Sequence, residues 1–253
     1  MDLGLNGKVA LVTGAGSQKG FGKGIALTLA REGCDIIAAD KDLEGAKQTV
    51  AEIQALGRKA KAFKTDVSKR SEVREMVSAA LAEFGRIDIL VNNAGVGSTP
   101  KPFIDKTEAD WDLDIDVNLR GVLNCTKAVL GQMLSRQSGK IINIASGAGL
   151  TGLAGRSIYS AAKGGVIAFT KALAKEVGPS GINVNCLTPG IGETNFAASI
   201  NAPPEHMTRV VAAIPMGRAA TPRDVANAVA FFSSDVASYI QGQALNVNGG
   251  LSM

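Results

Sequence analysis

Short hydrophobic runs alternate along the chain with longer amphipathic stretches. Runs such as 8–13 and 35–40 are mainly apolar and stop at glycine or acidic residues, which is typical of buried parallel strands. The stretches between them place apolar residues three or four positions apart, which predicts helices packed on a sheet. We expect strands at 8–13, 35–40, 59–65, 87–91, 140–145, 182–187 and 244–247. Helices are expected at 21–32, 42–56, 68–84 (capped by Ser68), 157–177 and 222–232, and a pair of helices over 108–136.

Repeated strand–helix units require a parallel sheet that is covered on both faces. The sequence therefore predicts an α/β fold with three layers. No linker or low-complexity segment interrupts the pattern, so we expect residues 1–253 to form a single domain. The segment 191–214 is the least regular, and its Pro203-Pro204 pair is expected to break any helix there. We interpret this segment as a substrate lid.

Composition and charge exclude several classes of function. The chain is 45% hydrophobic and 20% charged, and its net charge of +4 is scattered, so no nucleic-acid partner is expected. No apolar stretch has transmembrane length and the first residues lack signal-peptide features, which predicts a cytoplasmic protein with no membrane partner. Cys34, Cys125 and Cys186 are widely spaced, which favours buried reduced thiols over disulfides or a metal site.

A glycine-rich turn joins the first predicted strand to the first helix. It reads Thr13-Gly14-Ala15-Gly16-Ser17-Gln18-Lys19-Gly20-Phe21-Gly22. Glycines let the backbone approach a pyrophosphate, and a helix N-terminus offers free N–H groups. Asp40 ends the next strand, where a carboxylate can accept the ribose hydroxyls of NAD and repel the 2′-phosphate of NADP. A tight packing turn is the alternative, and Lys19 and Lys41 keep NADP open.

Tyr159 and Lys163 lie four residues apart on a predicted helix and so share a face. An ammonium about 4 Å from the tyrosine is worth roughly 4 kcal/mol, which would lower the tyrosine pKa by about three units. Such a pair can exchange a proton with an alcohol near neutral pH. Ser146 follows a predicted strand, where its hydroxyl can hydrogen-bond a substrate oxygen. The alternatives are a packing pair and an ordinary turn serine.

Further motifs follow in order, each at the end of a predicted element. They are Thr13-Gly14 with Gly20-Phe21-Gly22, Asp66-Val67, Asn92-Asn93-Ala94-Gly95, Asn118, Ser146, Tyr159-Ser160-Ala161-Ala162-Lys163 and Pro189-Gly190. Over nearly its whole length the chain thereby resembles the short-chain dehydrogenase/reductase (SDR) family, and it is similar to 3-oxoacyl-[acyl-carrier-protein] reductases and to alcohol and sugar dehydrogenases. The resemblance implies a Rossmann-type doubly wound parallel sheet.

The resemblance also implies roles for these residues. Tyr159 would protonate a carbonyl oxygen or deprotonate an alcohol, Ser146 would fix that oxygen, and Lys163 would bind the nicotinamide ribose. Asn118 would help hold a water that completes a proton relay. The implied cofactor contacts are Gly14, Gly20, Phe21 and Gly22 at the pyrophosphate, Asp40 at the ribose, Asp66 and Val67 at the adenine, Asn93, Ala94 and Gly95 along the cofactor, and Pro189, Gly190 and Thr194 at the nicotinamide amide.

The sequence departs from the family pattern in three places. Five residues separate Gly14 from Gly20, where three are usual, so either two residues are inserted or Gly16 replaces the first glycine. We favour the insertion, because Thr13-Gly14 ends the strand as in the family motif. Gly192 replaces a branched apolar residue, which predicts a looser lid. Asn248 replaces an aspartate at a structural site.

The function predicted from the sequence is the interconversion of a secondary alcohol and a ketone by hydride transfer with NAD(H). One alternative is an NADP(H)-dependent 3-oxoacyl thioester reductase. Another is a non-catalytic protein that senses dinucleotides, which the complete Ser–Tyr–Lys set disfavours. Enoyl reductases share a lengthened glycine loop but have a wider Tyr–Lys spacing. The resemblance implies a homotetramer or homodimer, the tetramers pairing helices 119–136 and 157–177. His206 is expected to be a solvated lid residue.

Overall fold

The computed structural model describes residues 2–196 and 204–252, and for residues 204–207 only the backbone. Seven strands form one sheet in the order β3-β2-β1-β4-β5-β6-β7, and every neighbouring pair is parallel. The predicted Rossmann-type doubly wound fold is confirmed. The strands are β1 (Val9–Thr13), β2 (Asp35–Asp40), β3 (Ala60–Lys64), β4 (Ile89–Asn92), β5 (Gly139–Ile144), β6 (Ile182–Pro189) and β7 (Ala244–Val247).

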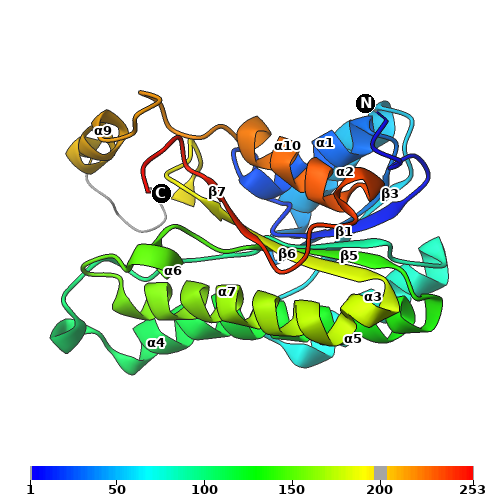
Figure 1. Cartoon of the computed structure of the whole chain (residues 1–253), viewed down its shortest axis with the longest axis horizontal. Coiled ribbons are helices and arrows are strands. Elements are labelled where there is room, and N and C mark those ends of the chain that lie inside the picture. The colour runs from blue at the N-terminus through cyan, green and yellow to red at the C-terminus, as the bar shows by residue number, and fades with distance from the viewer. Residues whose placement is uncertain (1, 197–203, 253) are drawn as a thin grey trace.

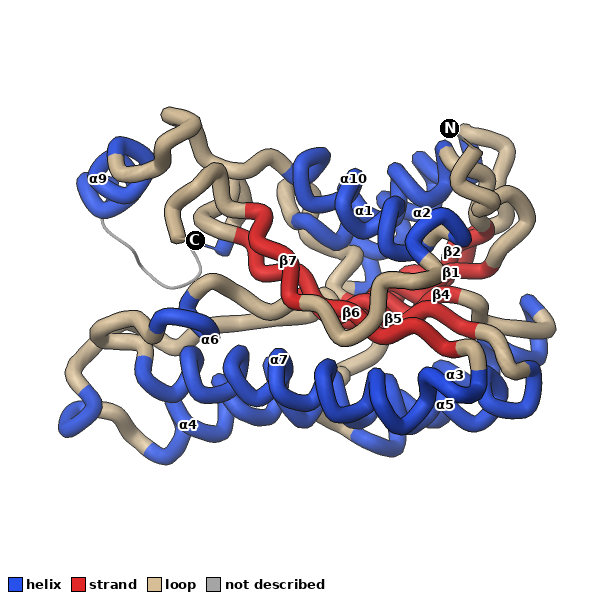
Figure 2. Tube along the Cα trace, viewed as in Figure 1, coloured by secondary structure: helices blue, strands red, loops and turns tan. Residues whose placement is uncertain are grey.

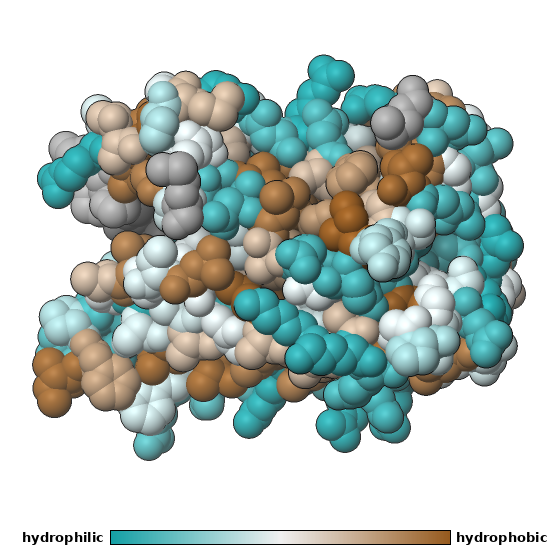
Figure 3. All heavy atoms as spheres, in the orientation of Figure 1, coloured by the Kyte–Doolittle hydropathy of each residue, from teal (hydrophilic) through white to brown (hydrophobic). Residues whose placement is uncertain are grey.

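Helices cover both faces of the sheet, as Figures 1 and 2 show. One layer contains α1 (Phe21–Arg31), α2 (Leu43–Ala55) and α10 (Pro222–Ser233). The opposite layer contains α3 (Arg70–Phe84), α4 (Glu108–Ile115), α5 (Gly121–Arg136) and α7 (Ser157–Val177). Two shorter helices, α6 (Ala148–Thr151) and α9 (Pro204–Ala212), lie near the end of the sheet where Figure 3 shows the surface hollowed.

Two hydrophobic cores lie on the two faces of the sheet. Successive strand residues point to opposite faces, so Val12 packs against α1 and α10 while Leu11 packs against α3, α5 and α7. Ile36 and Ile37 on β2 divide in the same way. Burial on both faces explains why the strands are continuous hydrophobic runs rather than alternating ones.

The order of the strands fixes where a ligand can bind. β1 lies between β2 and β4, so the chain leaves β1 on one side and later returns on the other. In open α/β sheets, a crevice forms at this switch point, outside the carboxyl ends of the strands. The β1–α1 turn, Asp40 and the segment after β4 all lie at these ends.

Three local expectations are corrected by the structure. The cap of α3 is Lys69, which makes no side-chain cap, because the Ser68 hydroxyl donates to Asp66 instead. Pro204 begins α9 rather than breaking a helix, since proline lacks an N–H that the first turn of a helix would leave unpaired anyway. β6 continues two residues beyond its predicted end, to Pro189. In the described part of the chain, no helix combines the length and apolar character needed to span a bilayer.

Candidate active site

One turn of α7 brings Tyr159 and Lys163 together beneath the carboxyl end of β5. Both side chains are buried, with 7% and 3% of their surface exposed. The Lys163 Nζ lies 5.8 Å from the centre of the Tyr159 ring and donates a 2.9 Å hydrogen bond to the Ile144 carbonyl. Ser146, two residues after Ile144, accepts a hydrogen bond from the Ala148 N–H. The structure thus groups these three predicted catalytic residues at one site.

Burial controls the protonation of this pair. It raises the pKa of Tyr159, and a hydrogen bond to Ser146 and the charge of Arg156 only partly oppose it. Burial also lowers the pKa of Lys163 to about 8. The net shift of the tyrosine pKa in this structure is therefore opposite to the one expected from the lysine charge alone. Loss of water costs the phenolate more than the neighbouring charges return.

Asn118 lies fully buried in a π-helical turn, Asp116–Arg120, between α4 and α5. Its amide donates to the carbonyls of Val96 (2.9 Å) and Asp114 (2.8 Å), and its carbonyl accepts the Val96 N–H (3.3 Å). These bonds fix the segment that follows β4. A Cβ added to Gly95 would lie 3.0 Å from the Asn118 Oδ1 and 3.4 Å from the Lys163 Nζ, so only glycine leaves this space open.

A side chain would clash at each of the four glycines of the β1–α1 segment, Gly14, Gly16, Gly20 and Gly22. Gly14 has a φ of +70°, and a Cβ there would lie 2.8 Å from the Ala94 Cα. A Cβ on Gly22 would lie 2.0 Å from the Gly14 carbonyl oxygen. Gly14, rather than Gly16, therefore occupies the turn directly after β1. Helix α1 then begins after Gly20 with no side-chain cap and no acidic residue in its first turn, which leaves its N–H groups available to an anion.

The residues inserted in this turn lie against the end of β2. The Asp40 Oδ2 accepts the Gly16 N–H at 2.6 Å, and its Oδ1 accepts the Asp42 N–H at 2.9 Å. The Gln18 amide donates to the carbonyls of Gly16 and Gly45, both at 2.9 Å. Each carboxylate oxygen of Asp40 has two lone pairs, so both retain acceptor capacity for hydroxyl groups.

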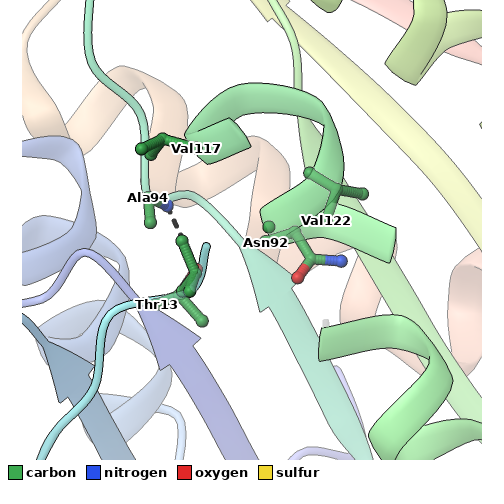
Figure 4. Close-up of a pocket in the computed structure, with 7 residues that line it drawn as sticks. Thr13, Asn92, Ala94, Val117 and Val122 are labelled. Carbon is green, nitrogen blue, oxygen red and sulfur yellow. Dashed lines mark hydrogen bonds between the residues drawn. The ribbon is translucent and has the colours of Figure 1, made fainter. Parts of the chain in front are cut away.

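A narrow pocket with no room for a water molecule lies between the ends of β1 and β4 and the turn that carries Asn118 (Figure 4). The Thr13 hydroxyl accepts the N–H groups of Asn93 and Ala94, and the Asn93 amide donates to the Thr13 carbonyl. These bonds hold the first turn against the fourth strand. The pocket is lined by Thr13, Val67, Asn92, Ala94, Val117, Gly121 and Val122. Val67 closes one side, and Asp66 before it accepts the Ser68 N–H and hydroxyl.

The segment after β6 contacts the start of α1. Gly190 donates to the Val247 carbonyl, and Gly192 pairs with Ala220. A Cβ on Gly192 would lie 2.3 Å from the Phe21 ring, so the absence of a side chain at Gly192 makes room for Phe21. The Thr194 N–H donates to the Gly192 carbonyl. The interpretation of 191–214 as a lid stays a prediction, because 197–203 and the His206 side chain lie outside the described residues.

Two features of the site were missed by the sequence analysis. Arg156, at the start of α7, is buried against Tyr159, but a lone arginine in a Gly/Ser stretch carries no recognisable pattern. A buried ladder of polar side chains joins β4, β5 and α7, where Asn92 donates to Asn143 and Asn143 donates to Thr170. Polar positions within hydrophobic runs were the only signal for this ladder.

The cysteines and metal ligands offer no further chemistry. All three cysteines are free and buried, and burial raises the thiol pKa of Cys34 and Cys125 to about 12 and that of Cys186 to about 11. Among the described residues, no cluster of three or more His, Cys, Asp or Glu side chains could hold a metal ion.

Comparisons with known proteins agree with this geometry. The family model described as "Enoyl-(Acyl carrier protein) reductase" matches residues 14–252. The chain is 43% identical to 3-oxoacyl-[acyl-carrier-protein] reductase of Synechocystis sp., with 98% of each chain covered. It is 41% identical to (2S)-[(R)-hydroxy(phenyl)methyl]succinyl-CoA dehydrogenase subunit BbsD of Thauera aromatica, with 99% of each covered. The chain belongs to the SDR family.

Solved structures place the chain in the same family. The crystal structure of 3-ketoacyl-(acyl-carrier-protein) reductase from Brucella melitensis, complexed with NADH, superposes with a TM-score of 0.91 at 39% identity, covering 98% of this chain and all of that one. This SDR protein is therefore an oxidoreductase that interconverts hydroxyl and carbonyl groups with a nicotinamide dinucleotide. The glycine cradle and the uncapped start of α1 fit such a cofactor.

Proposed function

We propose that the protein interconverts a secondary alcohol and a ketone with NAD(H), using Tyr159 as the acid and base. The observation that carries this proposal is the burial of Tyr159 and Lys163 on one turn of α7, next to Ser146 and to Gly95, where a side chain would crowd Lys163. Bound nicotinamide supplies or accepts the hydride. The acid and the hydrogen-bond donors are already in place at the carboxyl ends of the strands. They can therefore act on a carbonyl without reorganisation of solvent.

The chain's own residues manage the proton. Because burial raises its pKa, Tyr159 keeps its proton at neutral pH and can donate it to a carbonyl oxygen. The Ser146 hydroxyl holds the same oxygen. Lys163 uses one N–H on the Ile144 carbonyl and has two left for ribose hydroxyls. Both N–H groups of the Asn118 amide donate to backbone carbonyls, those of Val96 and Asp114. Asn118 therefore positions the segment after β4, beside the water of the proton relay, and does not contact the substrate.

Several residues are assigned to the cofactor by the same proposal. The start of α1 would hold the pyrophosphate, with Gly14, Gly20, Phe21 and Gly22. Asp66 and Val67 would hold the adenine. Asn93, Ala94 and Gly95 would follow the cofactor along the end of β4. Pro189, Gly190 and Thr194 would hold the nicotinamide amide.

NAD is the favoured cofactor because Asp40 places a carboxylate at the end of β2. Lys41, which could meet a 2′-phosphate, is mostly exposed, with its Nζ 3.9 Å from Asp66. A homologue from Brucella melitensis was crystallised with NADH. The names of the relatives favour a second candidate, a 3-oxoacyl thioester reductase, for which we keep NADP(H) as the alternative cofactor. We further propose a homotetramer or homodimer, and the cytoplasmic location stays a prediction.

Steady-state kinetics with NAD(H) and NADP(H), over ketones, alcohols and a 3-oxoacyl thioester, test the proposal. Tyr159→Phe should lower turnover by about 10²- to 10⁴-fold, the contribution of a general acid, while NADH binding measured by fluorescence persists. Tyr239→Phe is the matched control, because Tyr239 is fully exposed and the only other tyrosine. Near-normal turnover by Tyr159→Phe contradicts the assignment, and cofactor binding without turnover of any substrate indicates a dinucleotide sensor.

A further inference from the structure

Arg156 is a buried cation at the active site. It is 7% exposed, and its guanidinium carbon lies 5.0 Å from the centre of the Tyr159 ring and 5.3 Å from that of Phe196. The two rings are 5.9 Å apart, so the three side chains form one cluster. The Nε and Nη2 atoms of Arg156 are inaccessible to water, and neither has a hydrogen-bond partner in the structure as described.

Burying a guanidinium without partners is unfavourable. An uncompensated buried charge costs more free energy than cation–π contacts return, even when those contacts are desolvated. Burial lowers the arginine pKa, and the charges of Tyr159 and of the Asp114 carboxylate raise it by less. Both Asp114 oxygens are engaged by Ser98, one by its N–H at 2.8 Å and the other by its hydroxyl at 2.7 Å. The Nε and Nη2 atoms of Arg156 make no hydrogen bond to this carboxylate.

The backbone holds Arg156 in place from both sides. Its N–H donates to the Leu153 carbonyl at 3.0 Å, and its carbonyl accepts the Ser160 N–H at 2.8 Å in the first turn of α7. Gly155 before it has a φ of +76° and accepts the Lys101 N–H. The guanidinium is thus fixed relative to Tyr159, three residues along the same helix.

We propose that Arg156 binds an oxyanion group, a carboxylate or a sulfonate, carried by the ketone substrate a few bonds from its reacting carbonyl. This inference rests on the function proposed above and narrows its substrate class. A guanidinium presents N–H groups in a plane that matches such oxyanions. The guanidinium lies 5.0 Å from the centre of the ring of Tyr159, the residue proposed to protonate the carbonyl oxygen. The aromatic rings exclude water, which strengthens the pairing of the guanidinium with an anion.

A purely structural role for Arg156 makes a different prediction. In that case the guanidinium only fastens Phe196 to α7 through its ring contacts, and its loss weakens turnover of charged and neutral ketones alike. The ratio between an acid and its ester separates the two roles, since both carry the same carbonyl and differ only in charge.

The test measures NADH-dependent reduction of acetoacetate against methyl acetoacetate, levulinate against methyl levulinate, and acetonylsulfonate as the sulfonate. We expect the wild type to prefer an acid over its ester at least about 10-fold in kcat/KM, since hydrogen bonds to charged groups are worth 1.5–3 kcal/mol. Arg156→Gln should abolish that preference through the KM of the acid and change the ester less than about threefold. The acid-over-ester preference of Arg156→Lys should lie between those of the wild type and Arg156→Gln, because lysine keeps the charge but lacks the planar set of N–H donors.

Control measurements keep the outcomes distinct. Arg120→Gln is the matched control, because the Arg120 side chain is 66% exposed and pairs with Asp116 on the adjoining turn. NADH affinity and thermal unfolding check that each variant is folded. If Arg156→Gln fails to fold, the acid-over-ester ratios of kcat/KM in the wild type and in Arg156→Lys test the inference. Esters reduced as well as acids, or equal losses on both in the variants, overturn the inference and leave the proposed function standing. No turnover of any ketone or thioester overturns both.

Discussion

Lys163 is held in an environment that opposes its charge. Burial lowers its pKa from 10.5 to about 8, and the side chain is 3% exposed. Below pH 8 the lysine is protonated in both the folded and the unfolded chain, so folding must then bury an ammonium. A shift of this size corresponds to about 3 kcal/mol. The free energy of unfolding should rise with pH between about 8 and 10.5, because the unfolded chain binds more protons there.

Lys163→Met should therefore stabilise the cofactor-free protein at pH 7, by about 1–3 kcal/mol, while turnover is lost. The gain should shrink between pH 8 and 10.5, where the wild-type lysine becomes neutral first in the folded chain and then in the unfolded one. Urea unfolding across this pH range measures it. Lys127→Met, at an exposed position on α5, is the control and should show no such gain. A Lys163→Met protein that is less stable at pH 7 would contradict the argument.

The residues of the site differ in how far the sequence could locate them. Tyr159, Lys163 and Ser146 are brought together as expected, because helix periodicity and strand ends are local properties. The direction of the tyrosine pKa was missed, since it depends on depth of burial. Arg156 was missed because its contact with Phe196 joins residues forty positions apart.

At the scale of elements, the β1–α1 turn and the end of β2 act as one unit. Asp40 accepts the Gly16 N–H, so the lengthened turn is fixed by the carboxylate that the cofactor ribose is proposed to meet. Although the turn is longer than usual, Gly14 and Gly22 remain in close contact. Sequence spacing left two alignments of the glycines open, because only backbone geometry shows which glycine has the positive φ.

Asp40→Asn tests this unit, because it removes the charge and keeps an acceptor for Gly16. The NADH/NADPH ratio of kcat/KM should fall by about 10- to 100-fold, as a charged hydrogen bond to the ribose is weakened and repulsion of a 2′-phosphate disappears. Glu44→Gln, on the first turn of α2 and paired with Lys47, is the control. An unchanged ratio in Asp40→Asn, with a normal unfolding temperature, would show that another group selects the cofactor.

At the scale of the whole molecule, the layer that contains α4, α5 and α7 leaves large apolar side chains exposed. Leu123 and Leu134 on α5 are 38% and 40% exposed, and eleven residues, three helical turns, separate them on one face. Just before and within α4, Phe103 stacks on Trp111 and Ile104 is 89% exposed. The sequence predicted the sheet. The spacing of apolar residues along a helix, however, does not show whether they pack in the core or in a contact between subunits.

Leu123→Glu with Leu134→Glu should disrupt the proposed pairing through α5 and α7. A closed two-fold interface presents each substitution twice, and burying an unpaired carboxylate costs several kcal/mol. Light scattering coupled to size exclusion should show a tetramer reduced to dimers, or a dimer to monomers. Leu56→Glu is the matched control, because Leu56 is 44% exposed but lies at the end of α2, in the opposite layer. A double variant with wild-type mass would place the interface elsewhere, whereas a monomeric wild type would mean that this face stays free in solution.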